Sequence, residues 1–129
     1  MQTQRETSAQ AEARALRTVT ELKPAQMAQQ LQETFSQKVT ALIAGVEDSK
    51  QVGRWARDQN APRIDSENRM RAACQVFAFI ADCENGHIAR AWMLGMNPQL
   101  DDTSPIEAIA KGRFKEVMAA ARSFQRGDL

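Results

Sequence analysis

The sequence predicts an all-α protein, a small helical bundle with an N-terminal helix-turn-helix, a long central helix and a C-terminal helical domain. Three observations support this class. Strong helix formers such as Ala, Gln, Arg, Glu, Leu and Met dominate. Tyr is absent, and no apolar residues alternate with polar ones as in a half-buried strand. Instead, apolar residues recur every three or four positions, which is the spacing of a helix face.

Residues 1–23 are expected to be a flexible N-terminal arm, because they are polar and lack a continuous apolar stripe. Only Leu16, Val19 and Leu22 suggest a weak helix, which would stop before Pro24. Pro24 suits the first turn of the next helix, where a missing N–H is not needed. We therefore expect a helix-turn-helix region over 24–64 and a C-terminal region, with the central helix, over 65–129.

The region 24–64 contains two successive apolar stripes. The first comprises Met27, Leu31 and Phe35, and the second comprises Phe35, Val39, Leu42, Ile43 and Val46. Gly45 is expected to end the second helix, since glycine readily adopts the left-handed conformation. Asp48 or Ser49 would cap the next helix, expected over 49–59.

That next helix has a polar face and an apolar face. Lys50, Gln51, Arg54, Arg57 and Asp58 lie on one side, and Val52, Trp55 and Ala56 lie on the other. The polar side chains suit DNA, because Arg can bind guanine, Gln can bind adenine and Lys can bind phosphate. An ordinary solvated face is an equally good interpretation of the spacing alone. The candidate DNA contacts are Ser49, Lys50, Gln51, Arg54, Arg57 and Arg63.

The second half contains the strongest helix signal, from about residue 65 to 83. Apolar residues lie on two of its faces, so it is expected to be buried from two sides, with Phe77 and Ile80 in the core. A short helix with Ile88 and Trp92 on its apolar side should follow. Two further helices are expected, one capped by Ser104 and one beginning near Phe114, before a free tail at 126–129.

Residues 35–63 resemble the helix-turn-helix of Xre-type regulators. The resemblance depends on Ala-Leu-Ile-Ala-Gly-Val at 41–46 and Val-Gly-Arg-Trp-Ala-Arg at 52–57. In that motif a small residue faces the second helix, a glycine begins the turn, and a Val and a Trp bury the second helix. Here the interval between Gly45 and Val52 is one residue longer than the usual pattern.

The C-terminal half resembles the Xre/MbcA/ParS-like antitoxins. The matching positions are Trp92, Asn97, Leu100, Pro105, Gly112 and Val117. The resemblance implies a type II antitoxin that covers the active site of a RES-domain, NAD-degrading toxin and represses its own operon by binding operator DNA. It would bind the toxin through Arg113, Phe114, Arg122, Phe124, Arg126, Asp128 and Leu129.

The expected partners are therefore a RES-domain toxin, operator DNA and a second copy in a homodimer. A stand-alone helix-turn-helix regulator without a toxin, and an interaction adaptor that has lost DNA binding, are the alternatives. We expect no catalysis, no cofactor, no metal site, no small-molecule substrate and no membrane association, because the single histidine, His87, has no ligand-like neighbours in the sequence. Cys74 and Cys83 would lie about 13 Å apart on one helix, too far to form a disulfide, as expected in the cytoplasm.

Overall fold

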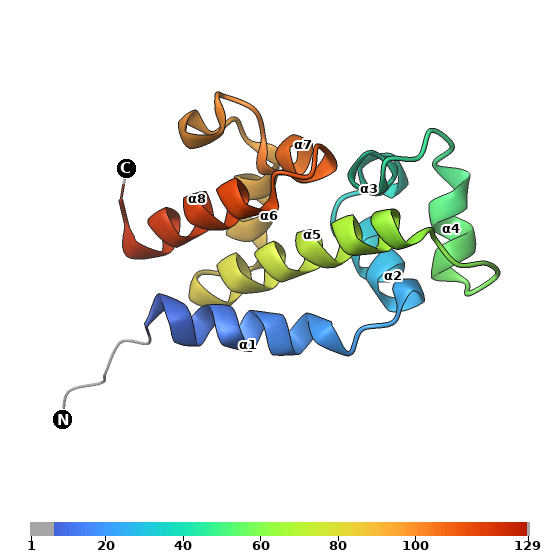
Figure 1. The fold of residues 1–129 in the computed structure, drawn as a ribbon, viewed down its shortest axis with the longest axis horizontal. Coiled ribbons are helices and arrows are strands. Elements are labelled where there is room, and N and C mark those ends of the chain that lie inside the picture. Colours follow the sequence, from blue (N-terminus) through green and yellow to red (C-terminus); the bar gives the residue numbers. More distant parts are fainter. Residues whose placement is uncertain (1–6, 129) are drawn as a thin grey trace.

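The computed structural model describes residues 7–128, and within that range it contains eight α-helices, one 3₁₀ turn and no strand (Figure 1). The elements are α1 (Ser8–Thr20), α2 (Pro24–Thr34), α3 (Gln37–Ala44), α4 (Lys50–Ala56), α5 (Ile64–Cys83), α6 (Gly86–Leu94), η1 (Pro98–Leu100), α7 (Pro105–Ala110) and α8 (Phe114–Arg126). The predicted all-α class is confirmed.

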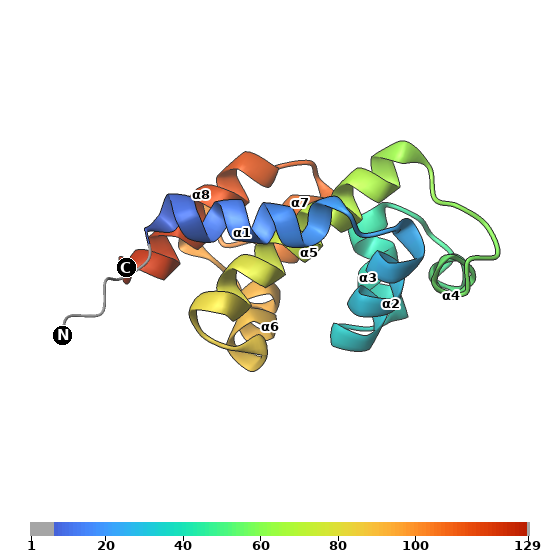
Figure 2. The same cartoon turned by 90° about the horizontal axis from the view of Figure 1, so that it is seen from below.

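The long helix α5 is the centre of the bundle. It packs against α1, α2 and α3 on the N-terminal side and against α6, α7 and α8 on the C-terminal side. Figures 1 and 2 show it running through the middle of the molecule, with α1 alongside it in both views. The prediction of a helix over about 65–83 buried from two sides is confirmed.

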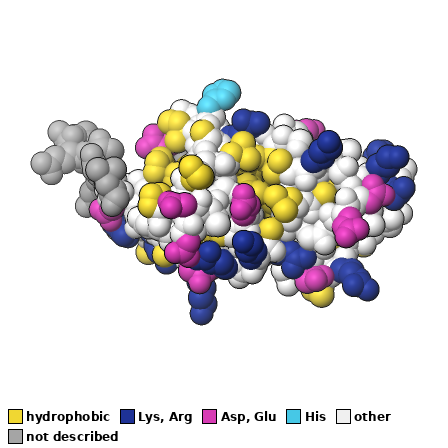
Figure 3. Space-filling view, turned by 90° about the horizontal axis from the view of Figure 1, so that it is seen from above, with side chains coloured by type: hydrophobic (Ala, Val, Ile, Leu, Met, Phe, Trp, Pro, Cys, Tyr) yellow, Lys and Arg dark blue, Asp and Glu magenta, His cyan; other side chains and the backbone are white. Residues whose placement is uncertain are grey.

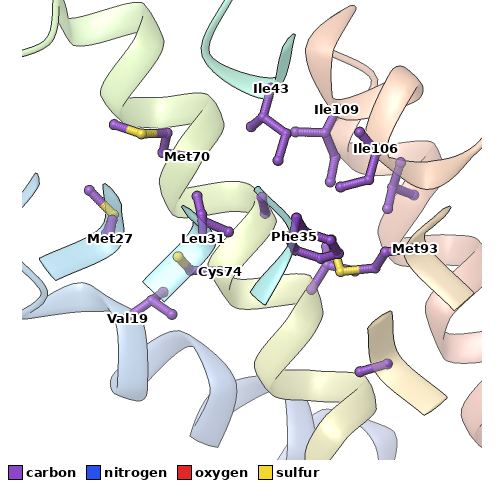
Figure 4. Packing of buried hydrophobic residues seen from close by; sticks show 14 of the residues in the cluster. Val19, Met27, Leu31, Phe35, Ile43, Met70, Cys74, Met93, Ile106 and Ile109 are labelled. Carbon is purple, nitrogen blue, oxygen red and sulfur yellow. The ribbon is translucent and has the colours of Figure 1, made fainter. Parts of the chain in front are cut away.

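The two halves of the chain share one hydrophobic core. Helix α3 packs directly on α7, and in Figure 4 Ile43 of α3 points toward Ile109 of α7. Both side chains are almost completely buried. The expected boundary between 64 and 65 therefore does not separate two cores, because buried residues from α1 to α8 form a single cluster.

The expectation of a flexible arm is wrong for residues 8–20, which form helix α1. Thr7 caps this helix by accepting a hydrogen bond from the Gln10 N–H. Ala11, Ala15 and Val19 are buried in its contact with α5. Two of these three side chains are alanines, so the apolar stripe was too weak to recognise in the sequence. Residues 1–6 lie outside the described range.

Arginines of α5 and α6 donate hydrogen bonds to carbonyls at the C-terminal ends of three earlier helices. Arg71 donates to the carbonyls of Val19 and Leu22 at the end of α1. Arg69 donates to the carbonyls of Ile43 (3.1 Å) and Ala44 (2.6 Å) at the end of α3, while Arg90 Nε donates to Thr34 O (2.9 Å) at the end of α2. The last carbonyls of a helix have no partner within it and carry partial negative charge, so a cation is well matched there.

Two helices, α5 and α6, bury partly different residues from those predicted. Ile80 is buried as expected, but Phe77 is only half-buried and Phe79 is the large ring in the core. On α6, Ala89 and Met93 are buried, whereas Ile88 is exposed. A stripe shows that a helix has an apolar face, but neighbouring helices decide which part of a wide stripe they cover.

Candidate nucleic-acid and protein interfaces

Helices α3 and α4 are joined by a five-residue connection, residues 45–49. Gly45 has a φ of 78° and ends α3, as predicted, because glycine adopts this conformation without strain. The Asp48 carboxylate accepts a hydrogen bond from the Lys50 N–H at 3.0 Å, so Asp48 rather than Ser49 supplies the side-chain cap of α4. Helix α4 ends at Ala56 and is shorter than the predicted 49–59.

The inner face of α4 is fixed against α2 and α3. Val52 and Trp55 are buried, as predicted, and Gln29 of α2 donates to the carbonyl of Ala56 at 2.7 Å. Gly53 is also buried, and a Cβ atom at this position would lie only 2.9 Å from Nε2 of Gln37 on α3. That atom is the end of an exposed, flexible side chain, so a larger residue at this position would require Gln37 to move aside.

The outer face of α4 presents most of the predicted DNA-contacting side chains to solvent. Lys50, Arg54, Arg57 and Arg63 are exposed, while Ser49 and Gln51 are half-buried. Within residues 7–128 the side chains of Lys50, Arg54 and Arg63 form no hydrogen bond or ion pair, and Arg57 makes only a 3.4 Å contact to Gln59. In Figure 3, several Lys and Arg side chains lie at the end of the molecule that carries α4 in Figure 1, with acidic side chains among them.

Unpaired cations of this kind can bind phosphate oxygens or the edges of bases. The major groove of a duplex is wide enough to admit one α-helix, which is the geometry that DNA binding by α4 requires. The acids of this region, Glu47, Asp48 and Asp58, are exposed and none of them pairs with the cations of α4 in the described part of the chain.

The predicted toxin-binding arginines, in contrast, have partners within the chain. Arg122 binds Glu12 of α1 at 2.7 Å, and Arg113 lies 3.4 Å from Asp101 and 3.7 Å from Glu116. Helix α8 includes Arg126, the first residue of the free tail that was expected over 126–129.

Arg126 binds Asp128 at 3.0 Å, just after the end of α8. The two phenylalanines, Phe114 and Phe124, are half-buried against the core. Leu129 lies outside the described residues, so the structure says nothing about its predicted contact.

A groove of about 460 Å³ lies between α6, η1 and α8. The rings of Trp92 and Phe124 form part of its wall, with centroids 5.9 Å apart, and Pro98 and Asp128 also line it. Met96, directly before the loop that lines the groove, is 81% exposed.

Leu94 and Ile88 on α6 are exposed as well. Ile88 was expected on the apolar side of its helix, and none of the three side chains was expected at an interface. The sequence signal that points to this surface is Met96, which lies in a Gly-Met-Asn-Pro segment outside any helical stripe.

The positions that carry the antitoxin resemblance are mostly structural. Asn97 accepts a hydrogen bond from the Gln99 N–H (2.9 Å) and shapes the loop between α6 and α7. Leu100 and Val117 are completely buried, and Gly112 has a φ of 79° at the end of α7. Trp92 and Asn97 are half-buried and both line the groove between α6, η1 and α8.

Reactive groups are not assembled at either interface. No group of three His, Cys, Asp or Glu residues suited to a metal occurs among residues 7–128. Both cysteines are unpaired; burial raises the pKa of the Cys74 thiol to about 12, and burial together with the Glu84 carboxylate raises that of exposed Cys83. In the described part of the chain, no helix is both long and apolar enough to cross a membrane.

Comparisons with known proteins identify no relative. No family model matches the chain, and neither a curated protein nor a solved structure matches it. The functional interpretation therefore depends on the geometry of the two surfaces and on the sequence resemblance.

Proposed function

We propose that this protein is an antitoxin that binds operator DNA through α4 and a RES-domain, NAD-degrading toxin through the surface of α6, η1 and α8. The observation that carries the proposal is the construction of α4. Its inner face is fixed by Val52 and Trp55, while Lys50, Arg54 and nearby Arg63 are exposed without partners in the described chain.

The DNA-binding half of the proposal follows from this two-faced helix. A buried tryptophan holds α4 in a fixed orientation, so the long cationic side chains are presented together. Such a surface suits the phosphate backbone and base edges of a duplex. One short helix reads few base pairs, so we propose that two copies bind a two-fold symmetric operator.

The toxin-binding half is supported by a second surface of different chemistry. Ile88, Leu94 and Met96 are exposed apolar side chains on α6 or directly after it, and the residues that follow Met96 line the Trp92–Phe124 groove. Exposed apolar area is a feature of protein-binding surfaces. Figure 3 shows apolar side chains toward the left and centre of one face and basic side chains toward the other end. In this proposal the protein covers the toxin's active site sterically and contributes no chemistry.

A stand-alone DNA-binding regulator is the second candidate. The cations of α4 suit it equally well, but it leaves the apolar surface around Met96 without a role. A gene for a RES-domain toxin next to the gene for this protein would support the antitoxin proposal over this alternative.

The DNA interface is tested by fluorescence anisotropy with a labelled duplex taken from upstream of the protein's own gene. Arg54→Ala should weaken binding by about 1–3 kcal/mol, and Lys50→Ala should lower the slope of log K against log salt by about 1. Lys115→Ala is the matched control, since it removes an exposed lysine from α8. Unchanged affinity for Arg54→Ala, or an equal loss for Lys115→Ala, would contradict the proposal.

The toxin interface is tested by growth of cells that co-express the protein with the neighbouring RES-domain toxin. Met96→Asp should abolish protection, because it places a charge on the apolar surface, while thermal stability and DNA binding remain unchanged. Leu16→Asp introduces the same charge at an exposed leucine of α1 and should protect as well as wild type. Full protection by Met96→Asp would exclude this surface as the toxin-binding site.

A further inference from the structure

A second pocket lies on the side of α5 that faces the connection between α7 and α8. Its volume is about 330 Å³, which is at the lower end of the range for small-molecule sites. Arg69, Arg71, Ala72 and Asn68 of α5 form one wall, and Ile109 and Phe114 form the other. None of the described residues that line it is acidic.

Two guanidinium groups are held at this pocket by the fold itself. The side chains of Arg69 and Arg71 are only 24% and 25% exposed, so both are largely ordered by their surroundings. Arg69 uses Nε and one Nη on the carbonyls of α3, and Arg71 uses both Nη atoms on α1 and on Glu67. Within residues 7–128, the other Nη of Arg69 and Nε of Arg71 have no hydrogen-bond partner.

The carboxylates near the two arginines neutralise them unequally, so one arginine can still bind a further anion. Glu67 lies 3.2 Å from Arg71, but Asp65 is 3.8 Å from Arg69 and largely exposed. Arg69 is therefore the less neutralised of the two. A carboxylate can accept two parallel hydrogen bonds from a guanidinium group, which is among the stronger polar contacts in proteins.

The opposite wall of the pocket is apolar. Ile109 is almost completely buried and Phe114 is half-buried. Ala72 of α5 has a small side chain and therefore leaves room in the pocket. A ligand that fits must therefore combine a compact apolar body with one negative charge. We propose that this pocket binds a small aromatic carboxylate, its ring between Ala72, Ile109 and Phe114 and its carboxylate at Arg69.

A ligand bound in the pocket would alter the hydrogen bonds that Arg69 donates to the end of α3. Arg69 closes the C-terminal end of that helix through the carbonyls of Ile43 and Ala44, directly before Gly45 and the connection to α4. A carboxylate that shares the guanidinium group changes the charge on those hydrogen bonds. The inference goes beyond the proposed function, since it requires neither DNA nor a toxin.

The test is a ¹H–¹⁵N NMR titration of the full-length protein with indole-3-acetate, and with neutral indole-3-acetamide as the matched ligand. Indole-3-acetate should bind saturably with a Kd of about 1 mM or lower. The amide signals that move should belong to residues 68–75, 109–114 and 43–45. Indole-3-acetamide should bind at least about fivefold more weakly, because it lacks the charge.

Two variants address the walls of the pocket separately. Ala72→Leu should abolish binding by filling the space, and Asn68→Asp should weaken indole-3-acetate about fivefold without affecting the amide ligand. Gln99→Glu adds the same charge at the α6–α8 groove and should change nothing. The inference is overturned if no signal moves saturably, if the two ligands bind equally, or if Asn68→Asp and Gln99→Glu have the same effect.

Discussion

At the scale of single residues, five arginines of this chain illustrate two different roles. Arg69, Arg71 and Arg90 are tied to carbonyls at the ends of helices, whereas Arg54 and Arg63 have no partner among residues 7–128. The sequence alone does not separate these groups, because all five lie in helical segments or directly beside one. Only the packing of helices distant in sequence brings a carbonyl to one guanidinium and leaves another in solvent.

Arg71→Ala is expected to reduce the free energy of unfolding by about 2–3 kcal/mol. The variant leaves the carbonyls of Val19 and Leu22 without their charged donor, and hydrogen bonds to charged groups are stronger than neutral ones. Urea denaturation followed by circular dichroism measures the change. Lys115→Ala, which removes an exposed charge, should stay within about 0.5 kcal/mol of wild type. Equal stability of the two variants would contradict the capping role of Arg71.

At the scale of helices, the core of α5 is expected to depend on Phe79 more than on Phe77. Phe79 is completely buried, so Phe79→Ala should cost about 3–5 kcal/mol. Phe77 is half-buried and meets Phe35 edge-on, with ring centroids 6.2 Å apart. Phe77→Ala should therefore cost clearly less. Thermal melts of the two variants side by side decide the order, and a larger loss for Phe77→Ala would show that the buried face of α5 is wrongly assigned.

Helices with strong local signals could be predicted from the sequence, and those that depend on partners could not. Pro24 and Ser104 mark the starts of α2 and α7, and Gly45 marks the end of α3, because caps act within a few residues. Only a weak helix around Leu16 and Val19 was expected where α1 lies, because the buried face of α1 is mostly alanine. Its position is fixed by contact with α5 and by Arg71, both distant in sequence.

The exposure of the candidate DNA-binding side chains could be predicted from the sequence, whereas the surroundings of the candidate toxin-binding ones could not. An amphipathic helix with a buried Trp55 exposes its polar face wherever it packs, so Lys50 and Arg54 are exposed as expected. Around the C-terminus, Arg122 and Arg126 have partners in the chain, on α1 and just after α8. The apolar surface at Met96 is created by a loop, which has no periodicity to indicate it.

At the scale of the whole molecule, two surfaces of different chemistry are built on one core. Helix α4 exposes Lys50 and Arg54 on one surface, and the groove between α6, η1 and α8 lies on another, near exposed Met96. The single cluster of buried residues joins them, since α3 packs on α7 and α5 packs on both halves. Our proposal assigns DNA to the first surface and the partner protein to the second.

Hydrogen–deuterium exchange of the full-length protein, with and without duplex DNA from upstream of its own gene, tests this arrangement most directly. We predict that DNA slows amide exchange in peptides covering 37–57, because it covers α4. The exchange rate of peptides covering 86–100 should not change, because DNA leaves the apolar surface open. Slowed exchange at 86–100, or unchanged exchange at 37–57 when the DNA is bound, would contradict it.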